Sequence, residues 1–228
     1  MEYNKIFHKQ RPAIVLPHRY VMTEESFKKC IICGVVVVMS MFAGTNCLYA
    51  QTASGTINGH DYVDLGLSVK WATCNVGANK PSDYGNYYAW GETKTKETYT
   101  EENSKTFWKS MDDIAGNPKY DAARANWGGS WRMPTMEELE ELFDKCTWIR
   151  TTQDGHNGYI VTGLNGNSIF LPAAGSRGGY PCDGSACYYW SSSPFDGYSN
   201  EAYQLGYGEE NIGGSLRFMG KPVRPVTE

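Results

Sequence analysis

Residues 131–142 read WRMPTMEELEEL, and they contain the clearest local signal in the chain. Thr135 and Glu138 have the spacing of a capping box, in which the Thr135 hydroxyl accepts from the Glu138 amide and the Glu138 carboxylate accepts from the Thr135 amide. Apolar residues then recur at helical spacing, which predicts a helix from Met136 to about Lys145 with one buried face. That face comprises Met136, Leu139, Leu142, Phe143 and Cys146.

Downstream of this helix the sequence predicts β-strands. The dipeptide Asn165-Gly166 favours a type I′ turn, and the apolar segments on either side of it therefore predict a β-hairpin. Two further strand-like segments precede the C-terminal stretch KPVRPV. The four expected strands are 159–162, 168–171, 202–207 and 215–218.

The other segments predict short elements and long loops. Residues 60–76 alternate apolar and polar side chains with interspersed glycines, which is typical of short strands. Residues 81–102 read as a long ordered loop and residues 119–126 as a short helix. Residues 172–200 are rich in Gly, Ser and aromatic residues without regular periodicity. Two central helices with strands at both ends predict an α+β domain whose termini lie close together.

The N-terminal segment predicts export from the cytoplasm. Lys28 and Lys29 precede an apolar run, 30–43, which has the length of a signal-peptide core and is short for a bilayer span of roughly 20 residues. We expect cleavage after Ala50, which gives a protein at the cell surface, secreted or in the periplasm. The alternative is an uncleaved segment, residues 30–50, that anchors the chain in the inner membrane.

The expected organisation is one domain behind a targeting segment. Met22 is followed by TEESFKK and is a more natural start, which makes residues 1–21 an upstream extension. Residues 1–50 are then the extension plus signal peptide, and 51–58 form a short linker. Residues 59–228 are long enough to bury a sizeable core of their own.

The charge balance argues against a nucleic-acid partner. The chain has 21 Lys and Arg against 25 Asp and Glu, and residues 1–50 hold six of the basic and three of the acidic residues. The remainder therefore carries a formal net charge of −7. Binding to a phosphate backbone needs a basic face.

Four cysteines follow the targeting segment, and an even number in an exported chain is consistent with two disulfides. Three pairings are possible. Cys182 and Cys187 enclose only DGSA, so a local bridge between them is sterically easy, and Cys74 would then pair with Cys146. Free buried thiols are the alternative.

Several segments, in order, resemble the Fibrobacter succinogenes major paralogous domain, a family abundant in exported Bacteroidetes proteins. They span about residues 61–226, and the stretch around Pro134 also resembles formylglycine-generating-enzyme-like domains. The resemblance implies a C-type-lectin-like fold with two small antiparallel sheets, two helices, long ordered loops and paired termini. The matching segments are VDLGLSVKWATCNVGA, YYAWGE, DAARANWGGSWRMPT, GYIVTGLNGNSIFLPAAG, YYWSSS and RFMGKPVRPV.

A binding face is implied by a second resemblance, to the target proteins of diversity-generating retroelements. In those proteins the region from YWSSS to the C-terminus forms a variable binding surface. Carried over to this chain, the surface would comprise Tyr188, Tyr189, Trp190, Asp196, Tyr198, Asn200, Glu209, Glu210, Asn211 and Arg217.

We therefore expect a non-enzymatic binding module for a glycan or a surface protein. Tyr and Trp supply large contact areas at low entropic cost, and Asp, Asn and Glu supply hydrogen bonds. The triplets of calcium-dependent lectins, E-P-N or Q-P-D with W-N-D, do not occur, so we expect neither a metal nor a cofactor. A structural subunit of a surface or pilus assembly is the alternative.

An enzymatic function is weakly indicated. Cys182 and Cys187 have the spacing of the cysteine pair in formylglycine-generating enzymes, and thiolates suit Cu(I). However, the surrounding residues PCDGSACYY do not resemble that enzyme's motif. His60 and His156 lack a neighbouring partner in the sequence that would activate a nucleophile.

Overall fold

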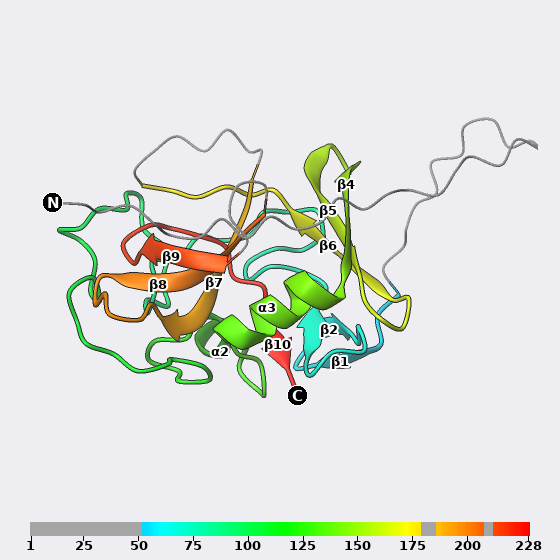
Figure 1. Ribbon diagram of the computed structural model, residues 1–228, viewed down its shortest axis with the longest axis horizontal. Helices are drawn as coiled ribbons and strands as arrows, with labels where there is room; N and C mark the ends of the chain where they lie inside the picture. The colour runs from blue at the N-terminus through cyan, green and yellow to red at the C-terminus, as the bar shows by residue number, and fades with distance from the viewer. Residues whose placement is uncertain (1–51, 179–185, 208–211) are drawn as a thin grey trace, which may run out of the picture. The chain divides into compact units, whose positions relative to one another are not determined.

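Three small antiparallel sheets and two short helices form the regular structure of residues 52–178, 186–207 and 212–228, which the computed structural model describes (Figure 1). The expected α+β class is confirmed, but three sheets are present in this part of the chain where two were expected. The expectations for residues 1–50, including the start at Met22 and cleavage after Ala50, lie outside the described residues. Within the described ranges, no helix has the length and apolar character that a membrane crossing requires.

The first sheet joins the two ends of the domain. Its strand order is β1-β2-β3-β10, and β10 pairs antiparallel with β3 through Val226 and Trp71. Asn58 and Gly59 both have positive φ, as a type I′ turn requires, and they connect β1 to β2. The expected proximity of the ends is therefore confirmed for the C-terminal strand. The strands are β1 Gly55–Ile57, β2 His60–Val63, β3 Lys70–Ala72 and β10 Val226–Thr227.

The second sheet contains the expected β5–β6 hairpin, with one difference at its turn. Gly166 has a φ of 86°, whereas Asn165 is not in the left-handed region, so the connection is not type I′. The Gly163 amide donates to Asn167 O, which leaves a three-residue loop that ends in a left-handed glycine. The strands are β4 Thr147–Gln153, β5 His156–Thr162 and β6 Ser168–Pro172.

The third sheet lies partly where an irregular region was expected. Its first strand, β7, has a register shift between Trp190 and Pro194 and pairs antiparallel with β8. The last strand, β9, lies a few residues before the segment 215–218 in which we expected it. The strands are β7 Cys187–Pro194, β8 Glu201–Tyr207 and β9 Ile212–Leu216.

The capping box begins a helix where the sequence predicts one. Helix α3, Met136–Lys145, starts after Thr135, whose amide donates to Glu138 Oε2 at 2.9 Å and whose hydroxyl accepts from the Glu138 amide at 3.3 Å. Arg132 adds a two-pronged ion pair to Glu138, at 2.6 and 2.7 Å. Both predictions, the helix and its cap, are confirmed.

The second helix, α2, is shorter than expected and spans Ala122–Trp127. Its N-cap is Asp121, whose carboxylate accepts from the Arg124 amide at 3.0 Å and from the Met133 amide at 2.9 Å. The same carboxylate therefore ties the start of α2 to the strand-like segment before α3.

Two apolar clusters form the core. The first contains Leu139 and Leu142 of α3, which packs against the third sheet, together with residues from all three sheets. The second is centred on the buried indoles of Trp90, Trp131 and Trp190. Because α3 packs against β7, β8 and β9, it holds the third sheet in place beneath the turn that connects β7 to β8.

A fully buried arginine joins the C-terminal segment to both the first and second sheets. The Arg224 guanidinium donates to Asn75 Oδ1 at 2.8 Å, to Ala72 O at 2.9 Å, to Thr73 O at 2.5 Å and to Phe170 O at 2.9 Å. Burial lowers the pKa of Arg224, because no carboxylate accompanies the charge.

Candidate ligand-binding site

Three aromatic residues expected on the binding face lie on strand β7, and they differ in how far they are buried. Tyr189 and Trp190 are at most 1% exposed and belong to the two core clusters, so they cannot contact a ligand. The Trp190 indole donates to Tyr88 O, and the Tyr189 hydroxyl donates to Pro172 O, both at 2.9 Å. Tyr188 is half-buried and lies against Lys221 Nζ, which is 5.0 Å from its ring centroid.

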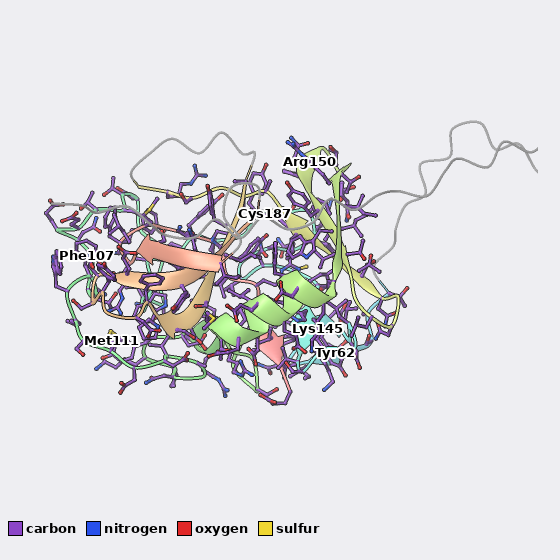
Figure 2. The ribbon with its side chains drawn as sticks, in the orientation of Figure 1. Tyr62, Phe107, Met111, Lys145, Arg150 and Cys187 are labelled. Carbon is purple, nitrogen blue, oxygen red and sulfur yellow. The ribbon has the colours of Figure 1, made fainter. Side chains whose placement is uncertain are left out.

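Three other residues of the expected face line one hollow of about 360 Å³: Asp196 and Tyr198 in the turn between β7 and β8, and Arg217 directly after β9. The segment Ser110-Met111 also lines this hollow. Figure 2 shows Met111 at the end of the molecule that carries the third sheet, beside Phe107. The residues lining the hollow are Ser110, Met111, Pro194, Phe195, Asp196, Gly197, Tyr198, Ser199 and Arg217.

The turn presents an aromatic wall in a fixed position. The Phe195 ring packs between Tyr198, at a centroid distance of 5.9 Å, and Tyr203, at 4.7 Å. Glu201 and Tyr198 are joined by a backbone hydrogen bond, and Gly197 supplies the positive φ that the turn needs. Tyr198 is 58% exposed, so its ring is available to a ligand.

Asp196 supplies the acidic group of the hollow. It is exposed, and its Oδ2 accepts from the Tyr203 hydroxyl at 3.3 Å. Desolvation and the charge of Asp196 raise the pKa of the Tyr203 phenol, which therefore stays a donor at neutral pH. The Asp196 carboxylate is thus oriented by Tyr203 and retains acceptor capacity for a ligand.

Arg217 was expected on the binding face, but its side chain is buried. It supports the residues that line the hollow. It is 1% exposed, with Nε donating to Glu201 O at 2.8 Å and Nη1 to Lys109 O at 2.7 Å. Its guanidinium lies 4.2 Å from the Trp90 ring centroid. Burial lowers the pKa of Arg217 to about 10, so it remains charged at neutral pH.

The Arg217 guanidinium holds the two sides of the hollow together. Its Nε holds the turn, and its Nη1 holds the segment before Ser110. Since Arg217 is buried and also lines the hollow, its role there is structural.

Of the remaining residues of the expected face, Asn200 does not line this hollow. Asn200 is half-buried, and its carbonyl accepts from the Arg217 amide at 2.9 Å. Glu209, Glu210 and Asn211 lie outside the described residues, as does Cys182.

None of the expected disulfides is present among the described residues. Cys74, Cys146 and Cys187 are free thiols there, and Cys182 lies outside the described residues, so the two pairings stay predictions. Cys74 packs against the tryptophan cluster and Cys146 against the cluster around α3. Cys187 is buried in the sheet and its thiol donates to Leu171 O at 3.4 Å. These cysteines therefore act as small apolar core residues.

The histidines take part in aromatic packing. His60 stacks on Trp127 with ring centroids 3.8 Å apart, and burial lowers its pKa while Asp61 partly opposes that effect. His156 meets the Tyr84 ring edge-on at 4.9 Å. Within the ranges that the structure describes, no three His, Cys, Asp or Glu side chains gather as a metal site would require.

Sequence reasoning missed the wall opposite Asp196 and Tyr198. Ser110 and Met111 lie in a polar stretch far from the turn in sequence. Long-range hydrogen bonds on both sides bring them to it: Arg217 donates to Lys109 O, and the hydroxyls of Ser192 and Ser193 donate to Asp113. The exposed Trp108, 70% accessible, was the available signal, because a solvent-exposed indole often marks a contact surface. Comparison with known proteins adds no further assignment: no family model, no curated protein and no solved structure matches this chain.

Proposed function

We propose that this chain is an exported, non-enzymatic binding module with a C-type-lectin-like fold, and that it takes a glycan in the hollow beside the β7–β8 turn. The observation that carries this proposal is the meeting of the exposed Tyr198 ring and the Asp196 carboxylate in one hollow, whose shape the buried Arg217 maintains. The aromatic ring and the carboxylate come from residues that the sequence resemblance singles out independently.

The chemistry of the hollow matches that of a sugar. The apolar face of a pyranose packs on an exposed aromatic ring such as Tyr198, while its hydroxyls need both donors and acceptors. Asp196 is an acceptor, and the hydroxyls of Ser110 and Ser199 can act as donors or as acceptors. A purely apolar ligand would leave these groups unpaired, which disfavours its binding.

The test is glycan-array binding by the purified protein in the presence of a chelator, followed by titration of the best oligosaccharide. We expect binding to persist in the chelator and Tyr198→Ala to weaken it about tenfold, since an aromatic contact contributes about 0.5–1.5 kcal/mol beyond its buried area. Leu164→Ala is the matched control, because Leu164 is a similarly exposed side chain, 67% accessible, in a turn of another sheet.

Two results would contradict the proposal. Equal affinity of wild type and Tyr198→Ala would mean that the glycan binds elsewhere. Absence of glycan binding together with co-purification in a large surface complex would favour the structural-subunit alternative.

A further inference from the structure

A second hollow is lined by the same loop that forms the wall of the first. Its volume is about 270 Å³. Lys105, Thr106 and Lys109 line this second hollow, and the next two residues, Ser110 and Met111, line the first. The other residues lining it are Gly91, Glu92, Thr93, Lys119 and Tyr120.

Three lysines give this hollow an uncompensated positive charge. Lys105, Lys109 and Lys119 are exposed, and none of them is within ion-pair distance of a carboxylate in the described part of the chain. Elsewhere, Lys96 and Lys145 do form such pairs, with Glu92 and Glu141. Three lysines without an ion pair therefore gather at one hollow in a chain whose formal net charge is −4.

The carboxylate in the hollow does not cancel this charge. Glu92 is 5% exposed, and its Oε1 accepts from Lys96 Nζ at 2.8 Å and from the Lys105 backbone amide at 2.8 Å. Lys96 therefore balances Glu92, and the Glu92 contact serves to hold the backbone of Lys105.

The effect of the lysines is visible at Tyr120. A hydrogen bond from Lys119 is the main cause that lowers the pKa of the Tyr120 phenol, and the charge of Lys109 contributes to it. Two lysines from different segments therefore lower the pKa of the same hydroxyl, and both line the hollow.

The backbone that carries these lysines is firmly held. Thr106 Oγ1 donates to Trp90 O at 2.5 Å, and Arg217 Nη1 donates to Lys109 O at 2.7 Å. The Lys119 amide donates to Asn117 Oδ1 at 3.0 Å. A compact oxyanion needs hydrogen-bond donors from several directions. Three flexible ammonium groups on a fixed backbone, with a hydroxyl nearby, meet this need.

We propose that the hollow lined by Lys105, Lys109 and Lys119 binds a sulfate or carboxylate group of an acidic glycan whose neighbouring sugar occupies the first hollow. This proposal rests on the proposed function, and it narrows the ligand class from glycans in general to anionic polysaccharides. The shared loop 105–111 makes one extended ligand able to contact both hollows.

The test compares a sulfated heparin hexasaccharide with the same hexasaccharide after chemical desulfation, by isothermal titration with the full chain. We expect Lys105→Gln, Lys109→Gln and Lys119→Gln each to weaken binding of the sulfated form about two- to fivefold, and the triple variant to weaken it at least about tenfold. Binding of the desulfated form, which keeps its uronate carboxylates but has lost the sulfates, should be weakened less than binding of the sulfated form. Added salt should weaken wild type more than the triple variant, because screening acts on exposed charges.

Lys80→Gln is the matched control. Lys80 is exposed, its ammonium group has no carboxylate partner among the described residues, and it lies outside both hollows. Full affinity of the triple variant for the sulfated hexasaccharide would overturn the proposal. So would inorganic sulfate competing as strongly as the hexasaccharide, which would indicate a site for the free anion. Tyr198→Ala distinguishes the two proposals, because it should weaken both hexasaccharides, and that result can stand even if the lysine variants have no effect.

Discussion

Replacing Arg224 with Met tests the central structural link of the domain. The guanidinium of Arg224 donates four hydrogen bonds, to Asn75 Oδ1 and to the carbonyls of Ala72, Thr73 and Phe170. Methionine has a similar volume but no donor, so all four acceptors would be left buried and unpaired.

The magnitude follows from these four contacts. At about 1 kcal/mol for each acceptor left without its donor, the loss is about 4 kcal/mol. Part of it is offset, because Met removes the cost of burying the charge that lowers the pKa of Arg224. We therefore expect Arg224→Met to lower the free energy of unfolding by about 3 kcal/mol, which corresponds to a decrease in Tm of about 6–12 °C for a domain of this size.

The assay is thermal and urea unfolding of the purified protein, followed by tryptophan fluorescence. Arg150→Met is the control, because Arg150 is exposed on β4 and forms no hydrogen bond or ion pair within the described residues. Arg224→Lys keeps the charge but lacks the planar fork of donors, so it should lie between wild type and Met and remain measurable if Arg224→Met does not fold. A decrease in Tm of less than about 2 °C for Arg224→Met would refute the reasoning.

Four further outcomes are expected. Thr135→Ala should lower the free energy of unfolding by about 1 kcal/mol in urea titrations, and Thr135→Ser should restore it; equal losses in both would argue against the cap. Burial and the charge of a nearby glutamate raise the pKa of Cys146 from 9.0 to about 11, and burial also raises the pKa of Cys187. Both thiols should therefore react slowly with iodoacetamide at pH 8 in the folded protein and rapidly in urea without reductant. Thiols that stay unreactive in urea would indicate disulfides. Because the unfolded thiols ionise first, stability should be intact below pH 9 and decrease as the pH rises through 11, which pH-dependent urea midpoints would show. Gly163→Ala should destabilise by about 1–3 kcal/mol in the same titrations, since its Cβ would lie 2.1 Å from Leu65 O; an unchanged midpoint would contradict this tight contact.

Local signals in the sequence predicted local structure well. The capping box at Thr135 and the helix after it depend on residues three or four positions apart, and the structure contains both. Strand β4 was not predicted. The dipeptide Asp154-Gly155 after it is a turn signal, and both residues have positive φ in the turn that connects β4 to β5. Strand β7 was missed because burial of Tyr189, Trp190 and the following serines hides the alternation that a half-exposed strand shows.

Tertiary contacts decided which candidate site residues reach the surface. Tyr198 and Asp196, which the resemblance to retroelement target proteins implies for the binding face, lie exposed in a short turn. Trp190 and Arg217 look equally suited to binding, but the indole hydrogen bond to Tyr88 O and the cation–π contact with Trp90 place them inside. No local pattern shows that Arg217 would reach a loop more than 100 residues earlier, and that contact helps to form the opposite wall of the hollow.

The pairing of β10 with β3 has a consequence for the biogenesis of this protein. Arg224 and Ala72, which lie at this pairing, are 152 residues apart, so the first sheet closes a very long loop. Closing such a loop is entropically costly and slow, and it can begin only after β10 has left the ribosome. The nascent chain therefore lacks the completed first sheet until β10 has been synthesised, and the apolar side chains that this sheet covers stay exposed until then.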